Sequence, residues 1–187
     1  MIISPSKGQV KLHLLDPFKR LYPNVRCIID CFEVFSETPR ALDIQAALWS
    51  DYKHHYTVKF LVAITPNGAP RYVWQCYGGR ATDKYIVRDC DFLKCVEPYD
   101  QIMADRGFKI SEELLLRNAS LCISPSTKAG MQMFAGDVRE TSRIANVRIY
   151  VEQVIGRLKQ FHILKKILPI NYLPLCDDIV QVVCALT

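Results

Sequence analysis

A charged residue in the middle of an apolar segment is the feature that most restricts the fold of this chain. Residues 25–35 read VRCIIDCFEVF, a run of strand-forming residues that carries Asp30 between Ile29 and Cys31. Such a run predicts a buried strand. An ionised carboxylate in a dry core is so costly that it must be neutralised, paired, hydrogen-bonded or bound to a metal. The strand must therefore pass through a place where Asp30 finds a partner.

The segments that follow change from strand patterns to an alternation of helices and strands. Strands are predicted at 56–65 and 71–77 around a turn, and at 101–104 and 121–124. Residues 1–24 and 125–138 read as irregular, and helical patterns lie at 41–48, after Thr82 as N-cap, at 111–118 with Ser111 as cap, at 140–161 and at 177–186. We expect an α/β fold with a mixed five-stranded sheet, in which three antiparallel strands are followed by two parallel strands, with helices on both faces.

Composition places the chain among globular domains. Its 187 residues, half of them hydrophobic, are enough for one domain with a substantial core. No run of about 18 apolar residues occurs, so we expect no membrane partner. The eight cysteines form no Cys-x-x-Cys pair and lie mostly in apolar runs, which favours reduced, buried thiols in a cytosolic or nuclear protein over zinc ligation or disulfides.

Positive charge is concentrated in one segment near the end of the chain. From Arg139 to Lys166 there are seven basic residues and two acidic ones, so this segment carries as much net charge as the whole chain, +5. The same segment contains a helical apolar stripe made of Ile144, Val147, Val151, Val154, Leu158 and Phe161. A basic helix of this kind is typical of a surface that binds phosphate groups.

Two further carboxylates join Asp30 as candidate metal ligands. Asp105 follows the strand at 101–104, and the carboxyl ends of parallel strands are where open α/β sheets bind their ligands. Glu152 follows the buried Val151 on the basic helix, on the flank of its apolar stripe. Carboxylate oxygens are hard ligands that suit divalent cations, so phosphoryl chemistry is the leading hypothesis.

Each carboxylate also has a purely structural interpretation. Asp30 could form a buried ion pair with Arg26, and Asp105 could start the turn that continues with Arg106 and Gly107. Glu152 could instead be a solvated helical glutamate that pairs with a basic residue of the same segment, either Arg148 or Lys159. Glu33 should face the opposite side of the strand from Asp30, so we leave it out of the proposed set.

Five segments in order resemble the DDE superfamily endonuclease domain of Harbinger-like (PIF/Harbinger-type) eukaryotic transposases. They are residues 27–35 (CIIDCFEVF), 52–60 (YKHHYTVKF), 78–83 (GGRATD), 104–108 (ADRGF) and 145–152 (ANVRIYVE). The resemblance covers residues 18–187 and implies a ribonuclease H-like catalytic domain there, with residues 1–17 as an N-terminal extension or linker remnant. It also implies that Asp30, Asp105 and Glu152 are the catalytic Asp-Asp-Glu metal triad.

The resemblance implies a reaction as well as a fold. Two Mg²⁺ ions, with Mn²⁺ as a substitute, would clamp the attacking and leaving oxygens of an in-line displacement at a phosphodiester bond. The domain would cut a DNA strand and then join the freed 3′-hydroxyl to target DNA. Because three clustered carboxylates repel one another without metal, at least one of their pKa values should be raised.

The remaining candidates concern DNA. Arg148 resembles the arginine that precedes the family's glutamate, and it could contact a phosphate or orient Glu152. Lys159, Lys53 and Arg80 are further candidates for DNA backbone contacts, although residues 78–80 lack the ending of a phosphate-binding loop and read better as a strand-to-helix turn.

The expected partners are DNA, as transposon ends and as target, and a second copy of the chain in a homodimer. No helix-turn-helix or zinc-binding module precedes the domain, so we expect either a separate DNA-binding protein or a fragment or truncated copy that lacks its N-terminal module. Nuclear localisation is expected. The alternatives are a domesticated or truncated transposase-derived protein that binds DNA without catalysis, and a nuclease that does not join strands.

Overall fold

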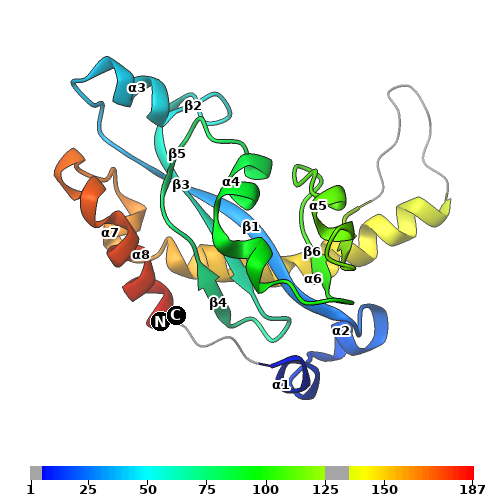
Figure 1. The fold of residues 1–187 in the computed structure, drawn as a ribbon. Helices are drawn as coiled ribbons and strands as arrows, with labels where there is room; N and C mark the ends of the chain where they lie inside the picture. The colour runs from blue at the N-terminus through cyan, green and yellow to red at the C-terminus, as the bar shows by residue number, and fades with distance from the viewer. Residues whose placement is uncertain (1–5, 125–134) are drawn as a thin grey trace.

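The fold is a mixed α/β arrangement built on one curled sheet (Figure 1). It is seen in a computed structural model that describes residues 6–124 and 135–187. Within these residues the sheet has seven strands in the order β2-β3-β1-β6-β7, with β4 and β5 both pairing with β3. The strands are β1 (Val25–Phe35), β2 (Trp49–Ser50), β3 (His55–Ile64), β4 (Pro70–Val73), β5 (Tyr77–Gly78), β6 (Gln101–Met103) and β7 (Ser120–Cys122).

The pairing directions agree with the sequence prediction, whereas the number of strands does not. β1, β3 and β4 pair antiparallel, and β6 and β7 add to β1 in parallel. The single strand predicted at 71–77 is divided into β4 and β5, and the short β2 pairs with β3 as well. The division has a local cause, because the backbone N–H of Cys76 donates to Asp177 Oδ1 (2.6 Å) and not to a neighbouring strand.

Helices cover both faces of the sheet. On one face lie α2 (Asp16–Leu21), α6 (Ala135–Leu158), α7 (His162–Lys165) and α8 (Cys176–Ala185), and on the other α4 (Asp83–Asp89), the 3₁₀ helix η1 (Asp91–Cys95) and α5 (Ser111–Leu115). The remaining helices are α1 (Lys7–Leu12), α3 (Leu42–Leu48) and the 3₁₀ helix η2 (Ile170–Leu175). None of the described helices combines the length and the apolar character needed to cross a bilayer.

The strand alternation of β1 divides the core into two clusters. Ile28, Phe32 and Val34 pack with the α6 and α8 residues, while Cys27 and Ile29 pack with α4, η1 and α5. Successive side chains of a strand point to opposite faces, so a run that is apolar on both faces needs helices on both sides. The burial of β1 therefore explains the three-layer architecture.

Several predicted boundaries were wrong. Part of the N-terminal stretch that reads as irregular forms α1 and α2, whose Val10 and Phe18 are buried. The cap of α5 is Ile110, without a side-chain hydrogen bond, in place of Ser111. Helix α6 begins at Ala135, inside the predicted loop, and the rest of that loop, 125–134, lies outside the described residues.

Gly78 and Gly79 allow close packing around the end of β5. A Cβ at Gly78 would collide with the carbonyl oxygen of Ala47, and one at Gly79 would collide with Thr57 Oγ1. Only glycine lets the chain pass so near another backbone. Gly78 is the last residue of β5, and Gly79 begins the strand-to-helix turn that the sequence indicates. Helix α4 follows this turn, with Thr82 Oγ1 at its N-cap accepting a hydrogen bond from the N–H of Tyr85.

Candidate metal site and nucleic-acid interface

Asp30 lies on β1 just beyond the point where one neighbouring strand ends. β6 follows β1 in parallel only as far as the pair Ile28 and Met103, so residues after Ile28 lie at an edge that β6 leaves open. On its other side Asp30 is opposite Val62 of β3. Asp30 is thus held by a strand on one side and faces open space on the other.

Burial governs the protonation of Asp30. Its pKa rises from 3.8 to about 6, mainly because the carboxylate is desolvated, and the nearby charge of Asp105 adds to the rise. Arg148 and the N–H of Cys31, which donates to Asp30 Oδ1 at 2.8 Å, act in the opposite direction. The expectation of one raised pKa is met, but repulsion between carboxylates is a smaller cause than burial.

Asp105 follows β6 at the carboxyl end of that strand, next to Asp30. Its Oδ1 accepts a hydrogen bond from the N–H of Arg106 (2.7 Å), and its carbonyl accepts one from Phe108 (3.0 Å). Asp105 therefore starts a turn, as its structural interpretation required. Its carboxylate also lines the same cleft as Asp30, so the two interpretations are compatible.

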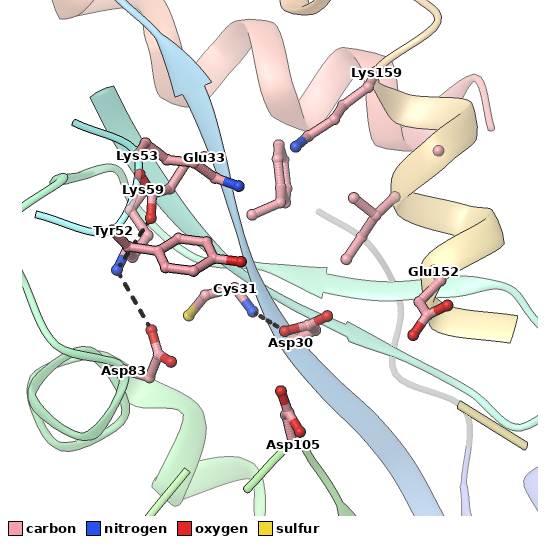
Figure 2. A pocket seen from close by; sticks show the side chains of 13 residues that line it. Asp30, Cys31, Glu33, Tyr52, Lys53, Lys59, Asp83, Asp105, Glu152 and Lys159 are labelled. Carbon is pink, nitrogen blue, oxygen red and sulfur yellow. Dashed lines mark hydrogen bonds and ion pairs between the residues drawn. The ribbon is translucent and has the colours of Figure 1, made fainter. Parts of the chain in front are cut away.

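Glu152 is presented by α6 at the opening of the cleft. The stripe residues Ile144, Val147, Val151, Val154 and Leu158 are all buried against the sheet, and Phe161, beyond the end of the helix, is half-buried. Glu152 follows Val151, so it lies at the border between the buried stripe and solvent, where its side chain is exposed. In Figure 2 it points from α6 toward the space that Asp30 and Asp105 also face.

The three carboxylates share one open cleft of about 610 Å³. They reach it from a strand, from the turn after a second strand, and from a helix (Figure 2). The cleft is lined by Asp30, Cys31, Phe32, Glu33, Tyr52, Lys53, Lys59, Asp83, Asp105, Glu152, Ile155, Gly156 and Lys159. Carboxylates that converge on an open, water-accessible space are a donor set that fits hard divalent cations.

Two of the proposed ion pairs do not form. Arg26 lies near Glu97 (3.6 Å) and Asp100 (3.9 Å) at the start of β1, so it does not neutralise Asp30. Arg148 donates from Nη1 to Asp105 Oδ1 (3.1 Å) and not to Glu152. Within residues 6–124 and 135–187, neither Arg148 nor Lys159 pairs with Glu152. Glu152 thus keeps both oxygens available for a ligand.

The four DNA-contact candidates occupy different places. Lys53 and Lys159 line the cleft, and Lys159, the first residue after α6, extends toward it in Figure 2. Burial lowers the pKa of Lys159, and the charge of Lys53 contributes to this. Arg80 lies outside the cleft, in an adjoining groove that also contains Lys84 and Lys109. The groove adjoins the cleft, because Tyr52, Lys59 and Asp83 line both.

A half-buried ionic group beside the carboxylates was not predicted. Lys59 Nζ lies 3.5 Å from Glu33 Oε1 and 3.6 Å from Asp83 Oδ1, and it donates to the carbonyl of Ala81 (3.0 Å). Glu33 also accepts from Thr57 Oγ1 (2.7 Å). Glu33 is on the opposite face of β1 from Asp30, as expected, yet both line the cleft because the cleft extends around the open edge of β1.

The pairing of Glu33 with Lys59 would follow from the antiparallel register of β1 and β3. Glu33 is directly opposite Lys59, and opposite charges in that position attract. The register could not be read from the sequence, because it depends on how the strands align.

A family model described as DDE superfamily endonuclease matches residues 29–187, which includes Asp30, Asp105 and Glu152. No curated protein matches the chain with significance, and no solved structure does so.

Proposed function

Because the chain belongs to the DDE superfamily endonuclease family, we propose that it is the catalytic domain of a transposase and that it cuts phosphodiester bonds in DNA with divalent metal ions. The observation that carries the proposal is the arrangement of Asp30, Asp105 and Glu152. Three carboxylates from separate elements face one open cleft, in a family whose members generally use divalent metals. A single acidic residue at a turn or on a helix would carry no such meaning.

In this proposal Asp30, Asp105 and Glu152 hold two Mg²⁺ ions, for which Mn²⁺ can substitute. When bound, such ions polarise the phosphate and lower the pKa of a water molecule that attacks it. The cleft is open enough to admit a DNA backbone, and its remaining cations suit phosphate oxygens. Lys53 and Lys159 are proposed to contact the backbone inside the cleft, and Arg80 in the adjoining groove.

Arg148 has a separate proposed role. Its guanidinium is bonded to Asp105, so it orients that carboxylate and offsets part of the negative charge of the cleft while no metal is bound. Its side chain is largely enclosed, whereas that of Asp105 is half exposed. Arg148 can therefore hold its position while Asp105 turns toward an ion.

The finer identity of the protein is also part of the proposal. We place it with the Harbinger-type transposases and give it a ribonuclease H-like fold, on the strength of the five sequence segments and the strand order. The proposed substrates are transposon ends and target DNA, and the proposed location is the nucleus. A homodimer and a further DNA-reading module, on this chain or on another protein, complete the proposal.

The deciding experiment measures nicking of a supercoiled plasmid that carries the matching terminal repeats. The protein is assayed with Mg²⁺, with Mn²⁺ and with a chelator, beside Asp30→Asn, Asp105→Asn and Glu152→Gln. These changes keep the size of each side chain and remove its charge. Asp43→Asn on α3, an exposed site outside the cleft, is the matched control.

Metal-dependent nicking that all three variants lose, and that Asp43→Asn keeps, is the expected result. Nicking by the folded protein that none of the three changes affects would show that another site cuts DNA. DNA binding without cleavage under any metal condition would favour the non-catalytic, domesticated alternative. Nicking without strand joining would identify a nuclease.

A further inference from the structure

Two cysteines and an aspartate meet on the side of the sheet where α8 begins, outside the acidic cleft. One ligand atom from each of Cys76, Cys176 and Asp177 lies within 4.8 Å of the other two. Cys76 lies between β4 and β5, whereas Cys176 and Asp177 are the first residues of α8. The group thus joins segments about 100 residues apart, which sequence spacing could not predict.

We propose that Cys76, Cys176 and Asp177 form a zinc site, with a water molecule as the fourth ligand. Thiolates are soft ligands that select zinc over magnesium, and three protein ligands with one open position is a common arrangement for this ion. Cys176 is buried, while Cys76 and Asp177 are half-buried. The half-buried side leaves a route by which the ion can enter.

The geometry requires only a small contraction. With zinc–sulfur bonds of about 2.3 Å, two sulfurs in a tetrahedral site lie roughly 3.8 Å apart. Cys176 Sγ is already 4.0 Å from Asp177 Oδ1. The longest separation in the group, at most 4.8 Å, must therefore close by about 1 Å. Side-chain rotation can supply this without movement of the strands.

Asp177 is already oriented by a second interaction. Its Oδ1 accepts the N–H of Cys76 at 2.6 Å, which fixes the carboxylate between the two thiols. Hydrogen bonds of this kind to a ligand are typical of metal sites, where they hold the ligand in its binding orientation. A carboxylate that only capped the backbone would not also need two cysteines beside it.

The position at the start of α8 suits the charge of the complex. Two thiolates and one carboxylate around Zn²⁺ leave a net charge of −1. Helix α8 has 10 residues, and the positive end of its dipole lies at Cys176. The positive end of the helix dipole therefore stabilises the negative charge of the loaded site.

The expected role is structural. Val180, Val183 and Cys184 of α8 belong to the core cluster shared with β1 and α6, and zinc would fasten the start of this helix to the edge formed by β4 and β5. None of the three ligands lines the acidic cleft. Zinc binding here and DNA cleavage there can therefore succeed or fail independently.

The test uses the full chain, reduced and freed of metal. Zinc added in equimolar amount should remain with the protein through gel filtration, one ion per chain, and should raise its thermal unfolding temperature. Cobalt in place of zinc should give the absorption of a cobalt–thiolate bond, and this absorption should persist in Cys31→Ser, which removes the thiol that lines the acidic cleft. Zinc should also protect Cys76 and Cys176 from alkylation, as read by peptide mass spectrometry.

Variants locate the site. Cys76→Ser and Cys176→Ser should each weaken zinc binding by at least about tenfold, the loss typical even of an outer-shell partner. Asp177→Asn should do the same, although its amide oxygen can still accept the N–H of Cys76. Cys95→Ser, a half-buried cysteine elsewhere, and Asp30→Asn combined with Glu152→Gln should leave the cobalt–thiolate absorption unchanged.

Three results would overturn the proposal. They are a folded, reduced protein that takes up no zinc, zinc that protects neither cysteine from alkylation, and a Cys76–Cys176 disulfide whose reduction restores no zinc binding. The alkylation result needs no variant, so it decides the matter even if a serine substitution prevents folding.

Discussion

Arg148 on α6 donates a hydrogen bond to Asp105 after β6, and its positive charge also acts on Asp30 in the same cleft. The two residues are 43 positions apart in the chain. The contact opposes the effect of burial on Asp30, whose pKa would otherwise rise further. Arg148 thus acts on two carboxylates of the cleft, because it donates a hydrogen bond to Asp105 and lowers the pKa of Asp30.

Arg148→Gln should raise the pKa of Asp30 above its value of about 6, because the nearby positive charge that lowers it is removed. The measurement is an NMR titration of the Asp30 side-chain carboxyl without divalent metal. Arg157→Gln is the control, since Arg157 is on the same helix but donates to Gly68 (3.4 Å). An identical titration in Arg148→Gln and the unaltered protein would contradict the assignment.

Stability should depend on pH through Asp30. Its folded pKa of about 6 exceeds the ordinary 3.8, so the folded protein binds more protons than the unfolded chain between these values. The stability that neutral Asp30 contributes is present below about pH 4 and is lost as pH rises through about 6. Asp30→Asn cannot ionise. Its free energy of unfolding at pH 7 should therefore exceed that of the unaltered protein by up to about 3 kcal/mol.

Urea unfolding across this pH range, without divalent metal, measures the difference. The advantage of Asp30→Asn should shrink toward zero in the acidic range. Asp43→Asn, at an exposed position, should show no comparable trend. A difference that stays constant with pH would mean that Asp30 does not titrate as described.

Lys59→Met should destabilise the fold by roughly 1–3 kcal/mol, because it leaves the half-buried carboxylate of Glu33 without its cation. Changing both Lys59 and Glu33 to Met should cost less than changing Lys59 alone. Chemical unfolding of the two single variants and the double variant forms the complete cycle. Lys94→Met removes an exposed pair with Asp91 and should leave the free energy of unfolding nearly unchanged. Additive effects of the two changes would argue against a coupled pair.

Lys159→Gln should reduce the salt dependence of DNA binding. If Lys159 contacts one phosphate, the slope of log affinity against log salt should fall by about one. Fluorescence anisotropy with a short duplex at several salt concentrations gives both slopes. Lys19→Gln on α2, which removes the same charge outside the cleft, should leave the slope unchanged. Equal slopes for the two variants would remove Lys159 from the interface.

Much of the framework could be predicted from the sequence. Local periodicity predicts the limits of β1 and the buried stripe of α6, because it shows which side chains are buried. The helical segments between the later strands predict that β6 and β7 join the sheet in parallel. The same periodicity placed Asp105 at a strand end and Glu152 beside a buried residue. Short helices such as α1 and α2 were missed because six residues give too few turns for a period to appear.

The contacts within the site depended on tertiary structure. The sequence by itself determined that Asp30 needed a partner, since burial of a charge is costly wherever it occurs. It could not determine that Arg148 bonds to Asp105, that Glu33 lies opposite Lys59, or that Cys76 meets Cys176 and Asp177. Those pairings depend on strand register and on where β6 ends, which only the packing of distant segments decides.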